Sequence, residues 1–200
     1  MPNRGRPQVF RGAAENVGGE MNSNVRIVPI NTIDAAFLDR LALCLEERFL
    51  SSARLERALV LPRSSLNAAR QQLFLSTLTS KVLRAFPDDA GVRLAITDFD
   101  LYKTSHRFIF GDGDDAQGVA AVSLYRLRSE FYGEPPDPNA LFQRTLKESV
   151  HQLGHAFGLK HCYNARCAMY YSNSIFETDN KLPHLCEVCD RRLNRARNER

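Results

Sequence analysis

Three histidines in the C-terminal half of the chain have the spacing of metal ligands. His151 and His155 are four residues apart, and His161 follows six residues later. Side chains four residues apart on an α-helix lie on one face, one turn above the other. Gly158 tolerates a positive φ, so the helix can end there and the chain can turn back toward the same point. Three neutral imidazoles around one centre, with a fourth position open, are typical of a catalytic rather than a structural zinc site.

Position 152 departs from the zinc-peptidase helix pattern, in which a Glu directly follows the first His. That Glu takes a proton from the attacking water and returns it to the leaving amine. This chain has Gln152 in place of the general base; its amide can accept a hydrogen bond but cannot take up the proton. Glu148, three residues before His151, is either a substitute base or an acceptor for an imidazole N–H.

Four of the five cysteines form a second candidate metal site. Cys162 follows His161 directly, Cys167 comes five residues later, and Cys186 and Cys189 make a C-x-x-C pair. Two such pairs separated by a loop predict a closed four-thiolate zinc site that holds together a small lobe with little core of its own. Free thiols, a redox pair and a nucleic-acid-binding zinc ribbon are the alternatives. The ribbon does not explain why the first cysteine adjoins a ligand of the first site.

The composition indicates an ordinary globular protein. The 200 residues are 44% hydrophobic and 25% charged, which suits one domain with a small appended lobe. No apolar run is long enough to span a membrane, and no signal-peptide-like segment opens the chain, so we expect a cytoplasmic protein without a membrane partner. The net charge of +4 owes much to residues 191–200, which we interpret as a solvated helix face and not as a nucleic-acid-binding tail. We expect a monomer.

The elements that position these residues alternate between strands and helices. Strands are expected at 25–30, 55–61, 92–97, 107–110 and 119–127. Helices are expected at 34–50, 66–85 and 138–157, and the last, capped by Asp137, carries His151 and His155. This order predicts a mixed α/β sheet with helices packed on it.

Two segments show no helical or strand period. Residues 1–24 are polar and are expected to form a loosely ordered extension. The Asp- and Gly-rich run 111–115 is expected to be a turn-rich loop. A calcium loop there is disfavoured, because the EF-hand spacing and its closing Glu are absent.

Together, the histidine and cysteine patterns resemble those of the archaemetzincins, a family in the metzincin clan of zinc metallopeptidases. The matching residues are His151-x3-His155-x2-Gly158-x2-His161, Cys162-x4-Cys167-x-Met169 and Cys186-x2-Cys189. The resemblance extends over about residues 25–193 and includes the segments 71–72, 97–101, 108–111, 123–127, 131–133 and 172–174. By this resemblance, Met169 is the residue of the Met-turn, the tight turn below the zinc.

The resemblance implies a minimal metzincin with a twisted, mixed five-stranded sheet. Residues 25–158 would form the upper lobe with the active-site helix, and 159–200 the lower lobe with the Met-turn and a terminal helix. It implies two zinc ions, one of catalytic type and one structural. Their ligands would be His151, His155 and His161 for the first, and Cys162, Cys167, Cys186 and Cys189 for the second.

The resemblance also implies a substrate, an extended peptide or unfolded protein that pairs with an edge strand, which we place within 118–127. Gln152 leaves two functions open. The first is a zinc metallopeptidase, of endopeptidase or aminopeptidase type, with weak or no activity. The second is an inactive pseudoprotease that keeps both zinc ions and binds peptides or a partner protein. A Gln introduced deliberately to trap a substrate is a third explanation of the residue.

Overall fold

The centre of the molecule is a five-stranded sheet with the strand order β2-β1-β4-β8-β7. The computed structural model describes residues 24–87 and 91–198, so the extension expected at 1–24 lies outside the described residues apart from Asn24. The strands are β1 (Val25–Ile30), β2 (Ala53–Leu55), β4 (Val92–Thr97), β7 (Gly111–Asp114) and β8 (Val119–Ser123). The first four in the order pair in parallel, and β7 pairs antiparallel with β8 at the edge. The predicted mixed α/β class and the five-stranded sheet are confirmed.

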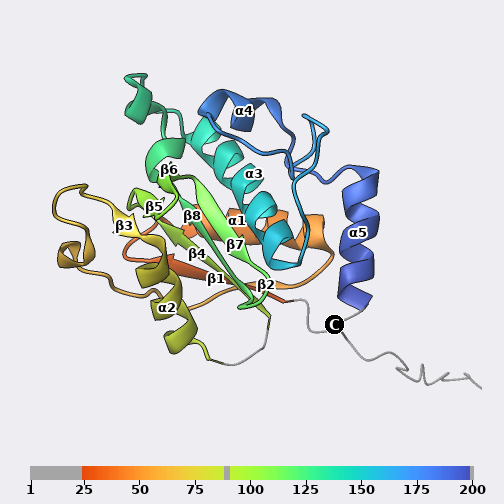
Figure 1. Ribbon diagram of the computed structural model, residues 1–200, viewed down its shortest axis with the longest axis horizontal. Helices are drawn as coiled ribbons and strands as arrows, with labels where there is room; N and C mark the ends of the chain where they lie inside the picture. The colour runs from red at the N-terminus through yellow and green to blue at the C-terminus, as the bar shows by residue number, and fades with distance from the viewer. Residues whose placement is uncertain (1–23, 88–90, 199–200) are drawn as a thin grey trace, which may run out of the picture.

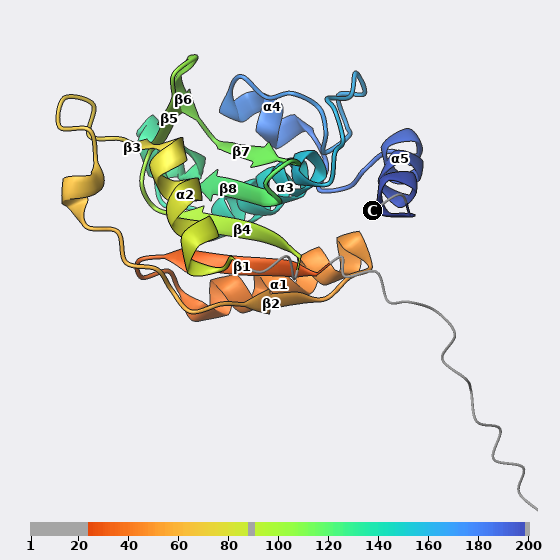
Figure 2. The same ribbon diagram turned by 60° about the horizontal axis from the view of Figure 1, so that its bottom comes forward.

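Side chains alternate between the two faces of this sheet and form two cores. Along β4, Leu94 and Ile96 join the core with the helices α1 (Ala35–Phe49) and α3 (Pro138–Ala156). Ala95 faces the opposite core, which contains Leu78 and Val82 of the helix α2 (Leu75–Ala85). The sheet is therefore covered on both faces, as strands that are buried throughout require (Figure 2).

Both long helices on the α3 side begin where their capping residues predict. Asp34 accepts a hydrogen bond from the Phe37 N–H at the start of α1. Asp137 accepts hydrogen bonds from the backbone N–H groups of Asn139 and Ala140 at the start of α3, at 2.9 Å each. Pro138 occupies the first turn of this helix. Two further helices, α4 (Ile175–Asn180) and α5 (Glu187–Asn198), follow α3 along the chain (Figure 1). The helices expected at 34–50 and 138–157 are confirmed.

A second, smaller sheet has the order β3-β5-β6 and lies beyond one end of the main sheet (Figure 2). Its strands are β3 (Leu73–Phe74), β5 (Leu101–Lys103) and β6 (His106–Ile109). Three short 3₁₀ turns complete the described elements, at Arg63–Ser65, Tyr125–Leu127 and Ser129–Tyr132. No helix among the described residues is both long and apolar enough to cross a membrane.

Three expected elements were wrong in extent. The strand expected at 55–61 is absent apart from Leu55, the last residue of β2, and an isolated bridge between Ile30 and Leu59. The helix expected at 66–85 begins at Leu75, because the Asn67 side chain accepts bonds from two following N–H groups and Gln71 adopts a φ of 54°. The strand expected at 119–127 ends at Ser123, where a 3₁₀ turn follows.

The run 111–115, expected to be a loop, contains the edge strand β7. Its pairing with β8 places β8 inside the sheet, so the edge strand expected within 118–127 is also misplaced. Glycine and aspartate are poor strand formers, which is why sequence patterning gives no strand here. Packing against α3 decides the conformation instead. The division into an upper and a lower lobe at residue 158 stays a prediction.

Candidate active site and metal centres

The structure brings the three predicted histidines together at the end of α3. His151 and His155 lie one turn apart on this helix, which ends at Ala156. Gly158 has a φ of 92°, and the chain turns back through a hydrogen bond from the Leu159 N–H to the Gly154 carbonyl. The Nε2 atom of His155 then lies 3.1 Å from the Nε2 atoms of both His151 and His161.

Backbone carbonyls orient two of the three imidazoles. His151 Nδ1 lies 2.7 Å from the Ala168 carbonyl oxygen, and His155 Nδ1 lies 2.8 Å from that of Leu159. A carbonyl can only accept, so each Nδ1 carries the proton and each Nε2 presents its lone pair to the common centre. Hydrogen bonds of this kind, made by the ring nitrogen that does not bind the metal, fix imidazole ligands in metal sites.

Burial keeps the three imidazoles neutral. It lowers the pKa of His151 to about 3, with a further contribution from the Lys181 ammonium. It also lowers the pKa of His155 and of His161. Neutral imidazole is the form that binds a metal, and the three ligand atoms lie within 4.8 Å of one another. This donor set fits a zinc ion, while the role of each residue as a ligand stays a prediction.

Glu148 belongs to a buried ion pair beside the cluster. Its Oε1 atom lies 2.8 Å from the Lys181 Nζ and accepts a hydrogen bond from the Thr178 hydroxyl at 2.9 Å. Burial alone would raise the pKa of Glu148, but the Lys181 charge and the hydrogen bonds outweigh it and lower that pKa. The expectation that Glu148 accepts from an imidazole was wrong, because the Ala168 carbonyl takes the His151 N–H.

The same carboxylate orients the Gln152 amide. Gln152 lies one helical turn beyond Glu148, and its Nε2 is 3.4 Å from the Glu148 Oε2. An ionised carboxylate can only accept hydrogen bonds, so the amide nitrogen faces it and the amide oxygen is left for another donor. Gln152 is buried and lines the cleft. It therefore offers a fixed acceptor where a zinc peptidase has its base.

Two glycines of β7 allow the edge strand to pack directly on α3. A Cβ atom on Gly113 would lie 2.1 Å from the Gln152 carbonyl oxygen, and one on Gly111 would lie 2.8 Å from the Gln152 Cγ. The two glycines are two residues apart, so they share one face of the strand. This close approach forms one wall of the cleft, and only glycine permits it.

We expect Gly113→Ala to lower the free energy of unfolding by about 1–3 kcal/mol, because its methyl group meets main-chain atoms that cannot rotate away. Urea denaturation followed by circular dichroism measures the change. Asp115→Ala, in the exposed turn after β7, is the control. A Gly113→Ala protein as stable as this control would contradict the packing described.

The histidines lie in a cleft with a volume of about 520 Å³. The cleft runs between α3, the edge strand β7, the strand β6 and the segment 171–173. Tyr171 lies on this last segment, with its ring centroid 4.8 Å from that of His161. A cleft lined by the edge strand of a sheet is suited to an extended ligand.

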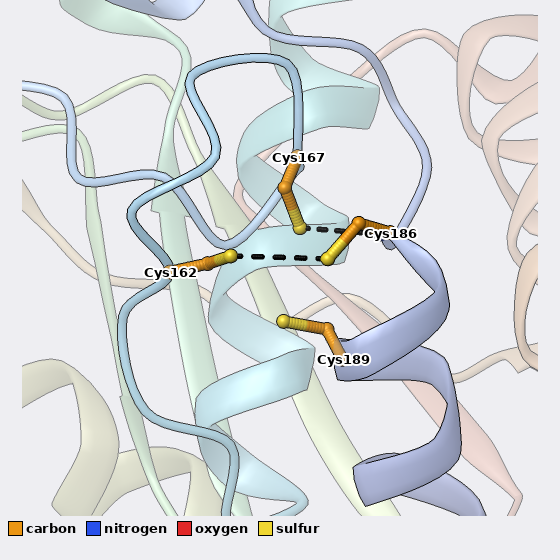
Figure 3. Close-up of side chains that lie close together, drawn as sticks. All are labelled: Cys162, Cys167, Cys186 and Cys189. Atoms are coloured by element: carbon orange, nitrogen blue, oxygen red, sulfur yellow. Dashed lines mark hydrogen bonds between the residues drawn. The ribbon is translucent and has the colours of Figure 1, made fainter.

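The four predicted cysteines also come together (Figure 3). Cys162 and Cys167 belong to the loop after α3, whereas Cys186 and Cys189 lie at the start of α5. The sulfur atoms of Cys162 and Cys186 are 3.8 Å apart, and the Cys186 N–H donates to the Cys167 sulfur at 3.3 Å. All four sulfurs lie within 4.8 Å of one another, which fits a tetrahedral metal site.

The thiols of this cluster differ in acidity. Burial raises the pKa of Cys167 and of Cys189. Burial acts in the same direction on Cys186, but hydrogen bonds from the Cys189 backbone and from the other thiols outweigh it and lower its pKa to about 7. Cys186 therefore loses its proton more readily than Cys167 and Cys189, and the thiolate is the form that binds a metal.

Met169 lies on the turn between the two sites. Its carbonyl accepts from the Cys162 N–H at 2.9 Å, and its side chain is fully buried. A Cβ atom on Gly154 would lie 2.3 Å from the Met169 sulfur, so the thioether packs on α3 between the two histidine positions. One short segment thus contacts the histidine-bearing helix and the cysteine cluster together.

Sequence reasoning missed several residues of the site. Lys181 and Thr178 lie about thirty residues from Glu148 along the chain, and no local spacing connects them. The carbonyl groups that orient the imidazoles belong to the main chain, so no residue type in the sequence identifies them. The alternation of Gly111 and Gly113 is a signal that could have been found, since glycines two apart mark one face of a strand.

Several known proteins have sequences similar to this chain. The archaemetzincin of Thermococcus kodakarensis is 47% identical over 122 residues, which are 61% of this chain and 64% of that protein. The archaemetzincin of Pyrococcus furiosus is 51% identical over 100 residues, 50% of this chain and 52% of that protein. The chain thus spans less than two thirds of the length of these two relatives. The archaemetzincin of Saccharolobus solfataricus is 32% identical over 174 residues, 86% of this chain and 93% of that protein.

Solved structures show the same fold. The archaemetzincin of Methanopyrus kandleri superposes with a TM-score of 0.77 at 29% identity, covering 92% of this chain and 99% of that one. A zinc-dependent peptidase from Methanocorpusculum labreanum gives 0.75 at 27% identity, covering 85% and 100%. The chain thus has the fold of these two solved structures, one an archaemetzincin and the other a zinc-dependent peptidase. A model described as "Peptidase family M54" matches residues 65–195, and the chain belongs to this family, the archaemetzincins.

Proposed function

We propose that this protein binds extended peptides at a three-histidine zinc site and hydrolyses them slowly. One observation supports slow turnover: every carboxylate that lines the cleft in the described part of the chain is in an ion pair. Asp112 is paired with Lys103 at 2.6 Å, and Glu148 with Lys181 at 2.8 Å. Pairing with a cation makes each of these carboxylates a weaker base, so neither is a ready replacement for a Glu at position 152.

His151, His155 and His161 would hold the catalytic-type zinc through their Nε2 atoms. When bound, zinc polarises a substrate carbonyl and lowers the pKa of a bound water to near 7. The residues of the chain supply the remaining steps. Gln152 accepts a hydrogen bond through its amide oxygen, which orients a donor but takes no proton from it. The absence of a general base typically costs 10²–10⁴-fold in rate, so we expect turnover reduced by about that factor.

The four cysteines would hold a second, structural zinc. They fasten α5 to the loop after α3, and Met169 between the two sites would form the Met-turn. Reduced thiols as ligands favour a reducing compartment, in line with the cytoplasmic location expected from the sequence. We propose a monomer.

The proposed substrate is a peptide in extended conformation. Strand β7 has a neighbour on one side within the sheet, and its residues Gly111–Gly113 line the cleft. Its other edge can form backbone hydrogen bonds with a peptide strand. We therefore propose β7 as the strand that pairs with the substrate, in place of the stretch 118–127 expected from the sequence.

A catalytically inactive pseudoprotease is the second candidate. The partners of Glu148 favour the pseudoprotease. Its Oε1 atom contacts Lys181 and Thr178 and its Oε2 atom faces the Gln152 amide, so this carboxylate is not available as a base. In this case, the cleft and both zinc sites bind a peptide or a partner protein without cleaving it. Restoration of the Glu at position 152, described in the Discussion, separates the two candidates.

Metal content tests the foundation of both candidates. We expect two zinc ions per chain in the purified protein and one in His161→Ala, measured by mass spectrometry of the metal. His184→Ala is the matched control, since His184 lies outside both clusters. One zinc in both the natural protein and His161→Ala would show that the histidines form no metal site, and the proposed peptidase function would fail.

A further inference from the structure

The charges that line the cleft are balanced except at one residue. Four charged side chains line it: Lys103, Arg107, Asp112 and Glu148. Lys103 is paired with Asp112, and Glu148 with the buried Lys181. Arg107 is exposed, and its guanidinium forms no ion pair or hydrogen bond with any residue that the structure describes. The described cleft therefore has one unpaired formal charge, and it is positive.

The backbone at Arg107 is held firmly although its side chain is free. The Arg107 carbonyl accepts hydrogen bonds from the Arg70 guanidinium at 2.7 Å and from the Gln72 amide at 3.1 Å. The Gln72 amide also donates to the buried carboxylate of Asp100 at 2.8 Å. These contacts fix the position of β6 at the rim of the cleft, so the Arg107 side chain extends from a rigid support.

The neighbouring residue is fixed by a second set of contacts. Arg126 binds Asp100 with two hydrogen bonds, of 2.8 and 2.7 Å, and its guanidinium lies 4.2 Å from the centre of the Phe108 ring. Phe108 also lines the cleft. Gln72, Asp100, Phe108 and Arg126 thus meet in one network. Their segments resemble the archaemetzincin family but contain no metal ligand. That network supports the Arg107–Phe108 rim.

We propose that Arg107 is a specificity-determining residue that binds a carboxylate of the peptide substrate. A guanidinium binds a carboxylate through two parallel hydrogen bonds, and a rigid support reduces the entropy lost on binding. The carboxylate belongs either to an Asp or Glu side chain or to the C-terminus of the peptide. This inference rests on the proposed function, since it requires a peptide in the cleft.

Peptide binding to the zinc-loaded natural protein tests the proposal without requiring turnover. The first set of labelled peptides ends in a C-terminal amide, and each pair differs only in having Glu or Gln at one position. A further Gln peptide has a free C-terminal carboxylate and is compared with its amide form. Fluorescence anisotropy gives the Kd of each. We expect one carboxylate peptide to bind about fivefold more tightly than its neutral counterpart, with the preference weakening as salt increases. A preference in the Glu series identifies the side chain, and one for the free carboxylate identifies the C-terminus.

Two variants assign the preference to one residue. We expect Arg107→Gln to abolish it and Arg107→Glu to reverse it in favour of a Lys peptide. Arg84→Gln, on the exposed face of α2 and away from the cleft, is the matched control and should retain it. The exposed Arg107 side chain forms no ion pair or hydrogen bond with the described residues, so these variants should fold normally, as circular dichroism will check.

The possible failures are distinguishable. Equal Kd values for all peptide pairs, or a preference that survives in Arg107→Gln, overturn the role of Arg107 but leave peptide binding intact. If no peptide binds the zinc-loaded protein, the proposed function fails, and the inference fails with it.

Discussion

Gln152→Glu is expected to raise the kcat for peptide hydrolysis by about 10²–10⁴-fold, the usual contribution of a general base. Glu and Gln have nearly the same shape, so the cleft accepts the change without repacking. The new carboxylate would follow His151 directly on α3, in the cleft that the three imidazoles also line. The substitution changes proton transfer and leaves the predicted zinc ligands in place.

The surroundings of position 152 also predict how the restored activity depends on pH. The Gln152 Nε2 is 3.4 Å from the Glu148 Oε2, so a carboxylate at 152 would face a second carboxylate. Repulsion between like charges raises the pKa of the new group above the usual value of about 4.3 for Glu, and the Lys181 charge partly offsets this. The base works when deprotonated, so the rate should rise with pH through that raised pKa. A pH-rate profile measures it.

The decisive comparison uses an unfolded protein substrate with quenched fluorescence. Gln152→Glu with His155→Ala should lose the gained activity, which excludes a contaminating protease. Gln152→Ala should resemble the natural protein, because neither residue accepts a proton. If Gln152→Glu retains its zinc yet cleaves nothing, the missing base is not the obstacle, and the pseudoprotease function is the better account.

Cys186→Ser is expected to cause the largest loss of stability, about 3–5 kcal/mol, or a decrease in Tm of about 6–20 °C. A structural zinc contributes its binding free energy to folding, and a serine hydroxyl is a poor replacement for a thiolate. Cys189 and Leu193 of α5 are buried in the main core. Most of the other described side chains of this helix are exposed. Loss of the metal would therefore release α5 with little else to hold it.

Thermal unfolding and zinc content should be measured on the same samples. Cys44→Ser is the matched control, since Cys44 packs against the core on α1 and lies outside the cluster. We expect Cys186→Ser to retain only the histidine-bound zinc. A Tm equal to that of Cys44→Ser, with both zinc ions retained, would contradict a structural role for the cluster.

The sequence predicts those parts of the site that depend only on the spacing of residues close together along the chain. His151 and His155 are adjacent on any helix, and Asp137 with Pro138 fixes where this helix begins. The cysteine pairs have a spacing that few structures other than a metal site require. The prediction of α3 and of both clusters therefore needed no knowledge of long-range contacts.

The parts that the sequence did not predict depend on contacts between distant segments. Strand β7 has the composition of a loop and becomes a strand because Gly111 and Gly113 allow it to lie against α3. The pairing of Leu73 with Leu101 adds to the local contacts of Asn67 in delaying the start of α2, because it holds Leu73 in a strand. The Glu148–Lys181 pair joins α3 to the end of α4. None of these contacts has a signal within a short window of sequence.

The two carbonyl groups that orient His151 and His155 have a consequence for natural variation. Ala168 and Leu159 present main-chain oxygens, which no substitution at position 152 removes. Codons for Glu and Gln differ by a single nucleotide, so a point mutation can switch proton transfer on or off while the imidazoles keep their orientation. Hydrolysis and metal-dependent binding can then be gained or lost independently. Under the proposed function, the residue that follows the first histidine would indicate turnover alone, and a gene encoding Gln there would still encode the proposed metal-binding framework.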